Sequence, residues 1–149
     1  MNKLINNEEV IIKEVKSLIE ESKHKIVSYV NTTLLFTYWN IGKKIIEYQG
    51  GKEKAKYGDK FIERLSKELT NEYGSSYSVR NLRLMRQFYN AYPIWHTVCA
   101  ELSWSCYRYI LPLIDSKKRT YYINEAITRQ LSVRELERLI HMKEKNLIK

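Results

Sequence analysis

The chain contains very few of the residues that interrupt helices. Only five glycines and two prolines occur in 149 residues. Folds built from β-strands need many tight turns, and tight turns depend on glycine and proline. The scarcity of both residues predicts an all-α fold of about six to seven helices.

The composition is that of a folded protein. Hydrophobic residues make up 44% of the chain and charged residues 29%, which is an ordinary balance for a globular domain with a real core. We expect one helical domain over residues 1–149. It would form either one compact unit or two small lobes, over about residues 8–92 and 101–145.

Apolar residues recur at helical spacing through the first third of the chain. They predict a helix over residues 6–30 and a second helix from about Asn31 to Tyr48, which is rich in aromatic and aliphatic residues. The second helix is expected at the centre of the first lobe. The segment QGGKEKAKYGD, residues 49–59, combines glycines with a lysine cluster and predicts a loop.

A helix, a short turn and another helix follow. Asp59 is a candidate N-cap for the first of these helices, and Gly74 stands where a helix C-terminus often needs a positive φ. Ser78 is the expected N-cap of the second helix, which Pro93 would end. This outline is that of a helix-turn-helix unit.

Three shorter helices are expected in the last third of the chain, after a connector over residues 91–101. Serines mark their starts, and Ser132 with Glu135 has the spacing of a capping box. The expected helices and caps are residues 104–114 after Ser103, residues 117–130 after Ser116, and residues 133–143 after Ser132.

The stretch Ser-Val-Arg-x-Leu occurs twice, at residues 78–82 and 132–136. Both copies combine an N-cap with apolar residues one and four positions later. Shared helix-start chemistry explains so short a match better than an internal duplication does.

The positive charge increases toward the C-terminal half. The net charge is +9, residues 73–100 carry three arginines and no acid, and residues 101–149 carry ten basic against six acidic residues. Such a field favours a polyanion, with nucleic acid ahead of an acidic membrane. The alternative is a basic surface that has no specific partner.

The helix after Ser78 separates its residues into two faces. At about 100° per residue, its aromatic and aliphatic residues gather on one side and its hydrogen-bond donors on the other. The donors are Arg80, Arg83, Arg86, Gln87 and Asn90. As a recognition helix it would place Arg80 and Arg83 on bases or phosphates, Gln87 on adenine, and the other two on phosphates. A solvated helix face is the alternative.

Two further surfaces are candidates for binding. Additional DNA contacts are predicted for Lys117, Lys118, Arg119, Arg134 and Arg138, for which a solubilising surface is the alternative. The aromatic-rich segment YPIWHTVCAELSW offers a protein interface in which Trp95 and Trp104 would be the main contacts.

Catalytic signals are weak. The three histidines are scattered without metal-ligand spacing, and no Cys-x-x-Cys or phosphate-binding glycine loop occurs. Glu14-Val15-Lys16 has the spelling of a nuclease fragment, but it lies in a helical pattern with no aspartate upstream. We therefore expect no catalytic site, metal or cofactor.

The cellular compartment is predicted from hydropathy and cysteine content. No apolar run is long enough to span a membrane, and the first ten residues lack the apolar core of a signal peptide. With two cysteines that form no disulfide framework, these signals predict a cytoplasmic protein with reduced thiols.

Several segments together resemble a known family. They are YWNIGKKI, YGDKFIERLSKEL, YSVRNLRLMRQFYNAY, LSWSCYRYIL and RTYYINEAITRQLSVRELERLI. In this order, and over about residues 10–143, they are similar to the N-terminal domain of YhcG-type nucleases. The chain departs from the family's usual residues at Cys106, where histidine is common, at Leu131, where tryptophan is usual, and at Leu139, where glutamine is usual.

The resemblance implies a helical, non-catalytic domain that engages DNA or partner proteins. In that family it precedes a nuclease domain of the PD-(D/E)XK superfamily, so cleavage is expected to require a C-terminal domain or a partner chain outside this sequence. Duplex DNA is the expected partner. The alternative is a protein-interaction or oligomerisation module that recruits a nuclease.

Overall fold

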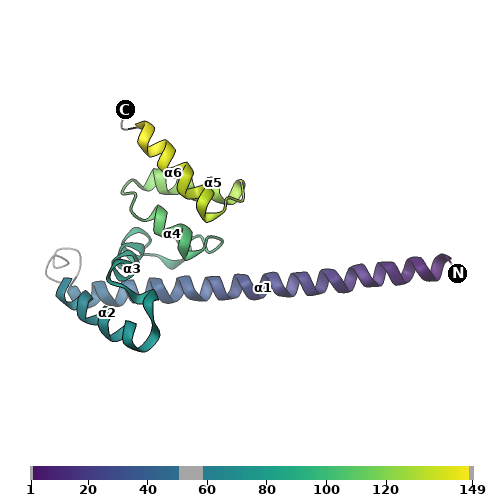
Figure 1. The fold of residues 1–149 in the computed structure, drawn as a ribbon, viewed down its shortest axis with the longest axis horizontal. Helices are drawn as coiled ribbons and strands as arrows, with labels where there is room; N and C mark the ends of the chain where they lie inside the picture. The colour runs from purple at the N-terminus through teal and green to yellow at the C-terminus, as the bar shows by residue number, and fades with distance from the viewer. Residues whose placement is uncertain (1, 51–58, 148–149) are drawn as a thin grey trace.

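The structure is a computed structural model that describes residues 2–50 and 59–147. Helices and connecting turns account for all of these residues, with no β-strand among them (Figure 1), which confirms the all-α prediction. The expected loop over residues 49–59 lies almost entirely outside the described residues, and so does the capping side chain of Asp59.

Within residues 2–50 and 59–147, six α-helices and two short 3-10 helices follow one another. Their bounds are α1 Asn2–Gln49, α2 Asp59–Tyr73, η2 Ser75–Tyr77, α3 Val79–Ala91, η3 Trp95–Thr97, α4 Trp104–Ile110, α5 Ser116–Thr128 and α6 Val133–Leu147.

The two helices expected over residues 6–30 and 31–48 are one continuous helix, α1. The predicted break at Asn31 is wrong because the Asn31 side chain does not compete for its own backbone. Its amide instead donates to the carbonyls of Ala100 and Leu102, at 2.8 and 3.0 Å. Asn31 thus fixes the connector before α4 and leaves the helix intact.

The turn between α2 and α3 forms as the sequence predicts. Gly74 has a φ of 96°, and its N–H donates to the Thr70 carbonyl at 3.0 Å. The Ser78 hydroxyl caps α3 by accepting from the Asn81 N–H at 3.2 Å. The helix bounds are confirmed, whereas a helix-turn-helix role in DNA binding stays a prediction.

The helix starts in the last third of the chain confirm two of three predicted caps. Ser103 caps α4, and Ser132 and Glu135 exchange backbone hydrogen bonds as a capping box, each at 3.2 Å. The bond from the Ser132 N–H lowers the pKa of the Glu135 carboxyl. Ser116 is not a cap, because the Asp115 carboxylate accepts from the Lys117 N–H at 2.9 Å instead.

Helix α4 is shorter than the predicted 104–114. It ends at Ile110, with Leu111 as its C-cap residue. Pro112 follows immediately and has no N–H to continue the helical ladder. The chain therefore turns here toward α5.

Buried side chains form two clusters. The larger joins Leu35 and Trp39 of α1 and Phe88 of α3 to residues of α4, α5 and α6, such as Tyr107 and Leu136. The smaller cluster lies where α1, α2 and α3 meet. The larger cluster crosses the boundary expected near residue 100. The division into two lobes stays a prediction.

Helices α1 and α3 approach each other very closely at Gly42. A Cβ at this position would lie 2.0 Å from the Met85 carbonyl oxygen and 2.6 Å from the Met85 carbonyl carbon. Only glycine allows the two backbones this distance. The glycine therefore sets the spacing on which both clusters depend.

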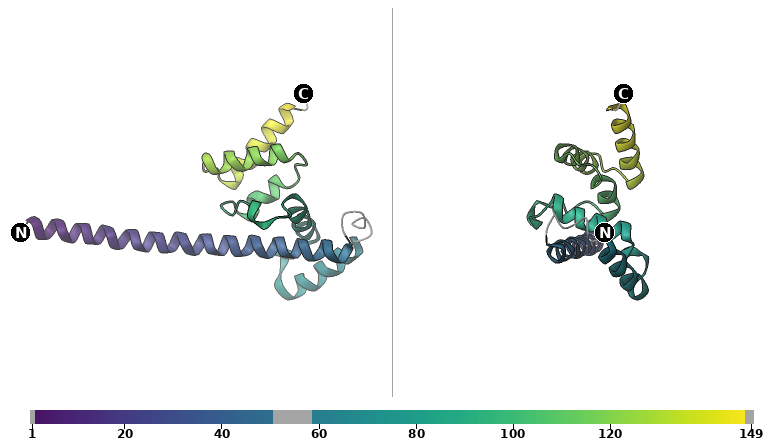
Figure 2. Two further views of the ribbon diagram at one scale, coloured as in Figure 1. Left: turned by 180° about the vertical axis from the view of Figure 1, so that it is seen from behind. Right: turned by 90° about the vertical axis from the view of Figure 1, so that its left-hand side faces the viewer.

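The N-terminal part of α1 extends away from the rest of the molecule (Figure 1; Figure 2). We call residues 10–30 the arm. We call the C-terminal part of α1, together with the other described helices, the body. Every residue of the arm is exposed to solvent. Figure 2 also shows α2 on one side of α1 and α4–α6 on the other.

We predict that Gly42→Ala lowers the free energy of unfolding by about 3 kcal/mol or more, because the methyl group must displace backbone atoms of Met85. Urea unfolding followed by circular dichroism measures the loss. Gly74→Ala is the control. Its Cβ would meet nothing within 4 Å, so only its positive φ should matter, at about 1 kcal/mol. Equal losses in the two variants would contradict the close-contact explanation.

Candidate nucleic-acid interface

A shallow hollow on the body is bordered by arginines from two helices. Its volume is about 410 Å³. We call it the arginine hollow, and its lining residues are Val79, Arg80, Arg83, Leu84, Gln87, Arg108 and Pro112. Arg80 and Arg83 are exposed, and Arg108 is half-buried.

The packing of α4 on α3 brings Arg108 into the hollow. The rings of Phe88 and Tyr107 lie with centroids 4.9 Å apart. The Gln87 amide donates a hydrogen bond to the Leu111 carbonyl at the C-terminal end of α4. These contacts place a guanidinium from α4 beside the first turns of α3.

The electrostatics of the hollow favour an anion. Among the side chains that the structure describes, no carboxylate forms an ion pair with Arg80 or Arg108. Arg80 also lies in the first turn of α3, where the helix dipole is positive. Guanidinium groups bind phosphate oxygens with paired hydrogen bonds. The hollow can therefore accommodate a phosphate group.

The five donor side chains predicted for one face of α3 lie in different environments. Arg80 and Arg83 border the hollow. Arg86 is half-buried and donates to the Gln49 side-chain oxygen at 3.2 Å, which ties α3 to the end of α1. Gln87 uses its amide N–H on Leu111, and Asn90 is half-buried.

The second predicted basic set also contains some side chains that bond within the body and others that are exposed. Lys118 forms an ion pair with Glu144 at 2.8 Å. Arg119 donates to the carbonyls of Leu113 and Ile114, at 2.8 and 2.9 Å, and lies over the Tyr92 ring. These two side chains connect helices within the body. The remaining members, Lys117, Arg134 and Arg138, are exposed.

The two tryptophans of the predicted protein interface make intramolecular ring contacts. Trp95 packs against Phe36 and Trp39, with centroids 4.9 and 5.8 Å apart. Trp104 packs against Tyr38 and Phe88, at 5.0 and 5.5 Å. Both tryptophans are half-buried, so only part of each ring faces solvent.

Arg108 is not among the DNA contacts predicted from the sequence. The sequence does set it apart, because it is the only charged residue between Trp104 and Ile114. A lone charge in an apolar segment often lies at the edge of a core with its charged end in solvent. Its proximity to Arg80 depends on the packing of α3 and α4, which no local pattern specifies.

The described residues hold no group of three or more histidine, cysteine, aspartate or glutamate side chains that could bind a metal ion. Within the same residues, no helix combines the length and hydropathy that crossing a membrane requires. Cys99 and Cys106 are both free thiols.

Comparisons with known proteins identify relatives of the chain. Residues 14–145 match the DUF1016 N-terminal domain. A protein of Escherichia coli (strain K12) named "Putative nuclease YhcG" is 31% identical over 156 residues, which cover 83% of this chain and 42% of that relative. The chain therefore spans less than half the length of the relative. No solved structure matches the chain.

Glu144 connects α6 to α5 through two hydrogen bonds. It accepts from the Lys118 ammonium at 2.8 Å and from the buried Tyr122 hydroxyl at 2.9 Å. These bonds favour the ionised carboxylate and lower the pKa of Glu144. Burial, with the same carboxylate bond, raises the pKa of Tyr122.

We predict that Glu144→Gln lowers the free energy of unfolding at pH 7 by about 1 kcal/mol or less, because Lys118 is 40% exposed and solvent screens the pair. The lowered pKa means that the carboxylate stabilises the folded state above the pKa of an unfolded glutamate, about 4.3. This stabilisation is lost as the pH falls through the folded pKa, so the two proteins should become equally stable in acid.

Urea unfolding at a series of pH values measures this difference. Glu137→Gln is the matched control, since Glu137 is an exposed glutamate of the same helix. A Glu144→Gln effect that did not change with pH would show that the ionised carboxylate is not what stabilises this contact.

Proposed function

The chain belongs to the DUF1016 N-terminal domain family, and from this premise we propose that it is a non-catalytic DNA-binding domain of a YhcG-like nuclease system. The name of the E. coli relative describes a nuclease, and a nuclease must engage nucleic acid. Cleavage would then come from a C-terminal domain or from a partner chain. This chain would hold the DNA substrate.

The arginine hollow is the observation that carries the proposal. It presents Arg80, Arg83 and Arg108 around one concave site. Surface helices usually mix charges of both signs, whereas residues 73–100 contain no acid at all. A concave site lined by one sign of charge focuses the field and attracts a polyanion.

The chemistry of the hollow suits the DNA backbone better than a base edge. Paired guanidinium hydrogen bonds and the start of α3 both favour a phosphate group. Because Gln87 already bonds to Leu111, its proposed pairing with adenine would require that bond to open. We therefore expect DNA to be bound through its phosphates, with little dependence on sequence.

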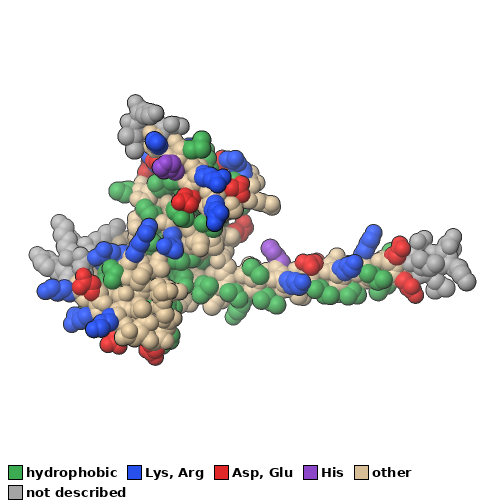
Figure 3. Space-filling model, in the orientation of Figure 1, with side chains coloured by type: hydrophobic (Ala, Val, Ile, Leu, Met, Phe, Trp, Pro, Cys, Tyr) green, Lys and Arg blue, Asp and Glu red, His purple; other side chains and the backbone are tan. Residues whose placement is uncertain are grey.

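Three exposed residues of the second basic set extend the proposed surface. Lys117 lies in the first turn of α5, and Arg134 and Arg138 lie one turn apart on α6. Figure 3 shows Lys and Arg side chains over this upper part of the body, with acidic side chains between them. Because the charges here are mixed, these residues would contribute less than the arginine hollow does.

The proposed setting is the cytoplasm. Cys99 and Cys106 are free thiols, as is usual in a reducing compartment. DNA is present there in bacteria. A protein-interaction role through Trp95 and Trp104 is the weaker alternative, because both rings already pack within the body.

We predict that the double variant Arg80→Ala/Arg108→Ala binds duplex DNA about ten-fold or more weakly at low salt, because two phosphate contacts are lost. The slope of log affinity against log salt should also fall by about two for the same reason. Fluorescence anisotropy with a labelled duplex over a salt series measures both quantities.

The control removes the same charge elsewhere. Arg64 and Lys67 are exposed on α2, and Arg64→Ala/Lys67→Ala should bind nearly as the parent does, with an unchanged slope. Equal losses from the two double variants would show that only net charge matters. Unchanged affinity of Arg80→Ala/Arg108→Ala would exclude the hollow as the site.

A further inference from the structure

The arm carries an apolar face that nothing in the described structure covers. At about 100° per residue, this face occupies roughly 120° of the helix. Its residues, each at least 48% exposed, are Ile11, Ile12, Val15, Leu18, Ile19, Ile26, Tyr29 and Val30. Figure 3 shows hydrophobic side chains along one side of the arm and charged side chains along the other.

A helix of this kind is poorly stable without a partner. Helices in proteins gain most of their stability from packing of an apolar face rather than from helix propensity. The arm is rich in isoleucine and valine, which are weaker helix formers than leucine or alanine. A partner along the apolar face would supply the missing contacts.

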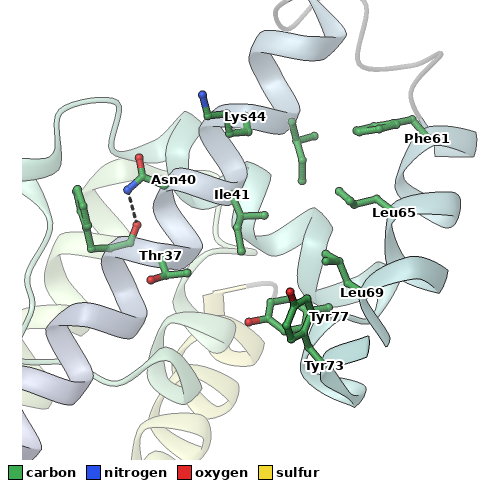
Figure 4. Close-up of a pocket in the computed structure, with 11 residues that line it drawn as sticks. Thr37, Asn40, Ile41, Lys44, Phe61, Leu65, Leu69, Tyr73 and Tyr77 are labelled. Atoms are coloured by element: carbon green, nitrogen blue, oxygen red, sulfur yellow. Dashed lines mark hydrogen bonds between the residues drawn. The ribbon is translucent and has the colours of Figure 1, made fainter. Parts of the chain in front are cut away.

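A second apolar surface lies on the same side of α1. The groove between α1 and α2 has a volume of about 640 Å³. Helix α1 contributes residues such as Thr37 and Asn40, and α2 contributes Phe61, Leu65 and Leu69 (Figure 4). We call this the α1–α2 groove.

The groove continues the apolar face of the arm. The helical positions of Phe36, Thr37 and Asn40 fall in the same sector as the apolar face, about 130° around α1 from the mean position of the buried residues Leu35 and Trp39. One straight helix therefore carries an apolar ridge in its N-terminal half and one wall of a groove in its C-terminal half.

We propose that two copies of this chain associate side by side and antiparallel, so that the arm of each fills the α1–α2 groove of the other. A twofold axis near the middle of α1 would place each arm along the groove of the second copy. This self-association is separate from DNA binding and uses a different surface.

Length and area support this arrangement over a simple pair of arms. At about 1.5 Å per residue the arm is about 30 Å long, and α2 is about 22 Å long, so the arm covers the groove. A strip about 12 Å wide along one arm is roughly 360 Å², so two arms pairing alone would bury about 700 Å², below the usual threshold near 1,000 Å². Reciprocal docking doubles this to about 1,400 Å².

The antiparallel arrangement also brings opposite charges together. Lys16 and Lys23 lie along the edge of the apolar face that, in an antiparallel pair, meets α2 of the second copy. The outer rim of α2 carries Glu68 and Glu72, both exposed, with the exposed Arg64 one turn before Glu68. Opposite charges would therefore meet along this edge.

The other edge is also complementary. It carries Glu14 and Glu21 on the arm, and the same edge of α1 carries Lys25 and, beside the groove, Lys43. Because an antiparallel pair brings like edges together, the acidic part of one copy meets these lysines of the other. Opposite charges therefore meet along both edges in the arrangement that the groove requires.

The oligomeric state tests the proposal without DNA. We expect sedimentation equilibrium of the full chain to show a reversible dimer, and Leu18→Glu to weaken it by about a hundred-fold or more by burying a charge in the apolar contact. Ser17→Glu adds the same charge to the opposite face of the arm, and it should leave the dimer unchanged. A chain that stays monomeric at all concentrations would overturn the proposal.

A charge exchange tests the partner surface. Lys16→Glu/Lys23→Glu should weaken the dimer about ten-fold or more, and Glu68→Lys/Glu72→Lys should do the same, because like charges then meet. The chain with all four substitutions should recover most of the parent affinity. Near-ultraviolet circular dichroism, which reports on the aromatic core, should match the parent in every variant.

The alternatives give different results. If the arms paired only with each other, Leu18→Glu would abolish the dimer while Glu68→Lys/Glu72→Lys had no effect. If the groove held another protein, the purified chain would remain monomeric. If the variant with all four substitutions did not recover the dimer affinity, the antiparallel arrangement would also be overturned.

Discussion

The close contact between α1 and α3 at Gly42 and Met85 is the constraint on which the rest of the body depends. It brings two helix backbones together with no side chain between them. Around it, the Trp39 indole N–H donates to the Tyr92 carbonyl at 2.7 Å. With α3 held in this way, Leu82, Met85 and Phe88 are buried in the core, and Arg80 and Arg83 are exposed.

A layer of aromatic rings packs α4 against α3 and so fixes the position of the last three helices relative to α3. Phe88 of α3 contacts Tyr107 of α4, whose hydroxyl donates to the Cys99 carbonyl at 2.6 Å. Burial raises the pKa of Tyr107, so this hydroxyl keeps its proton and remains a donor. The result is a fixed α4, and Arg108 therefore occupies one position relative to α3.

The two proposals divide the molecule between two kinds of chemistry. The arginine hollow is concave and cationic, and it lies on the body. The apolar face of the arm and the α1–α2 groove are mainly apolar, although Lys44 also lines the groove. A dimer built through the arms would carry two arginine hollows. Two phosphate-binding sites on one particle increase the effective concentration of DNA at the second site once the first is occupied.

The sequence by itself determined what depends on neighbouring residues. The scarcity of glycine and proline, the caps at Ser78, Ser103 and Ser132, and the positive φ of Gly74 act within a few residues of the chain, so they could be predicted. The two faces of α3 follow from helical spacing for the same reason.

Only the tertiary structure decided how the faces are used. The break expected at Asn31 does not occur, because its partners lie about seventy residues away. Arg86 bonds to Gln49 and Lys118 to Glu144, although local spacing made both look like surface donors. The apolar residues of the arm have the spacing of a helix that packs on one face, yet all of them are exposed. Periodicity shows that a face is apolar or basic, but which surface it meets is fixed by contacts between distant segments.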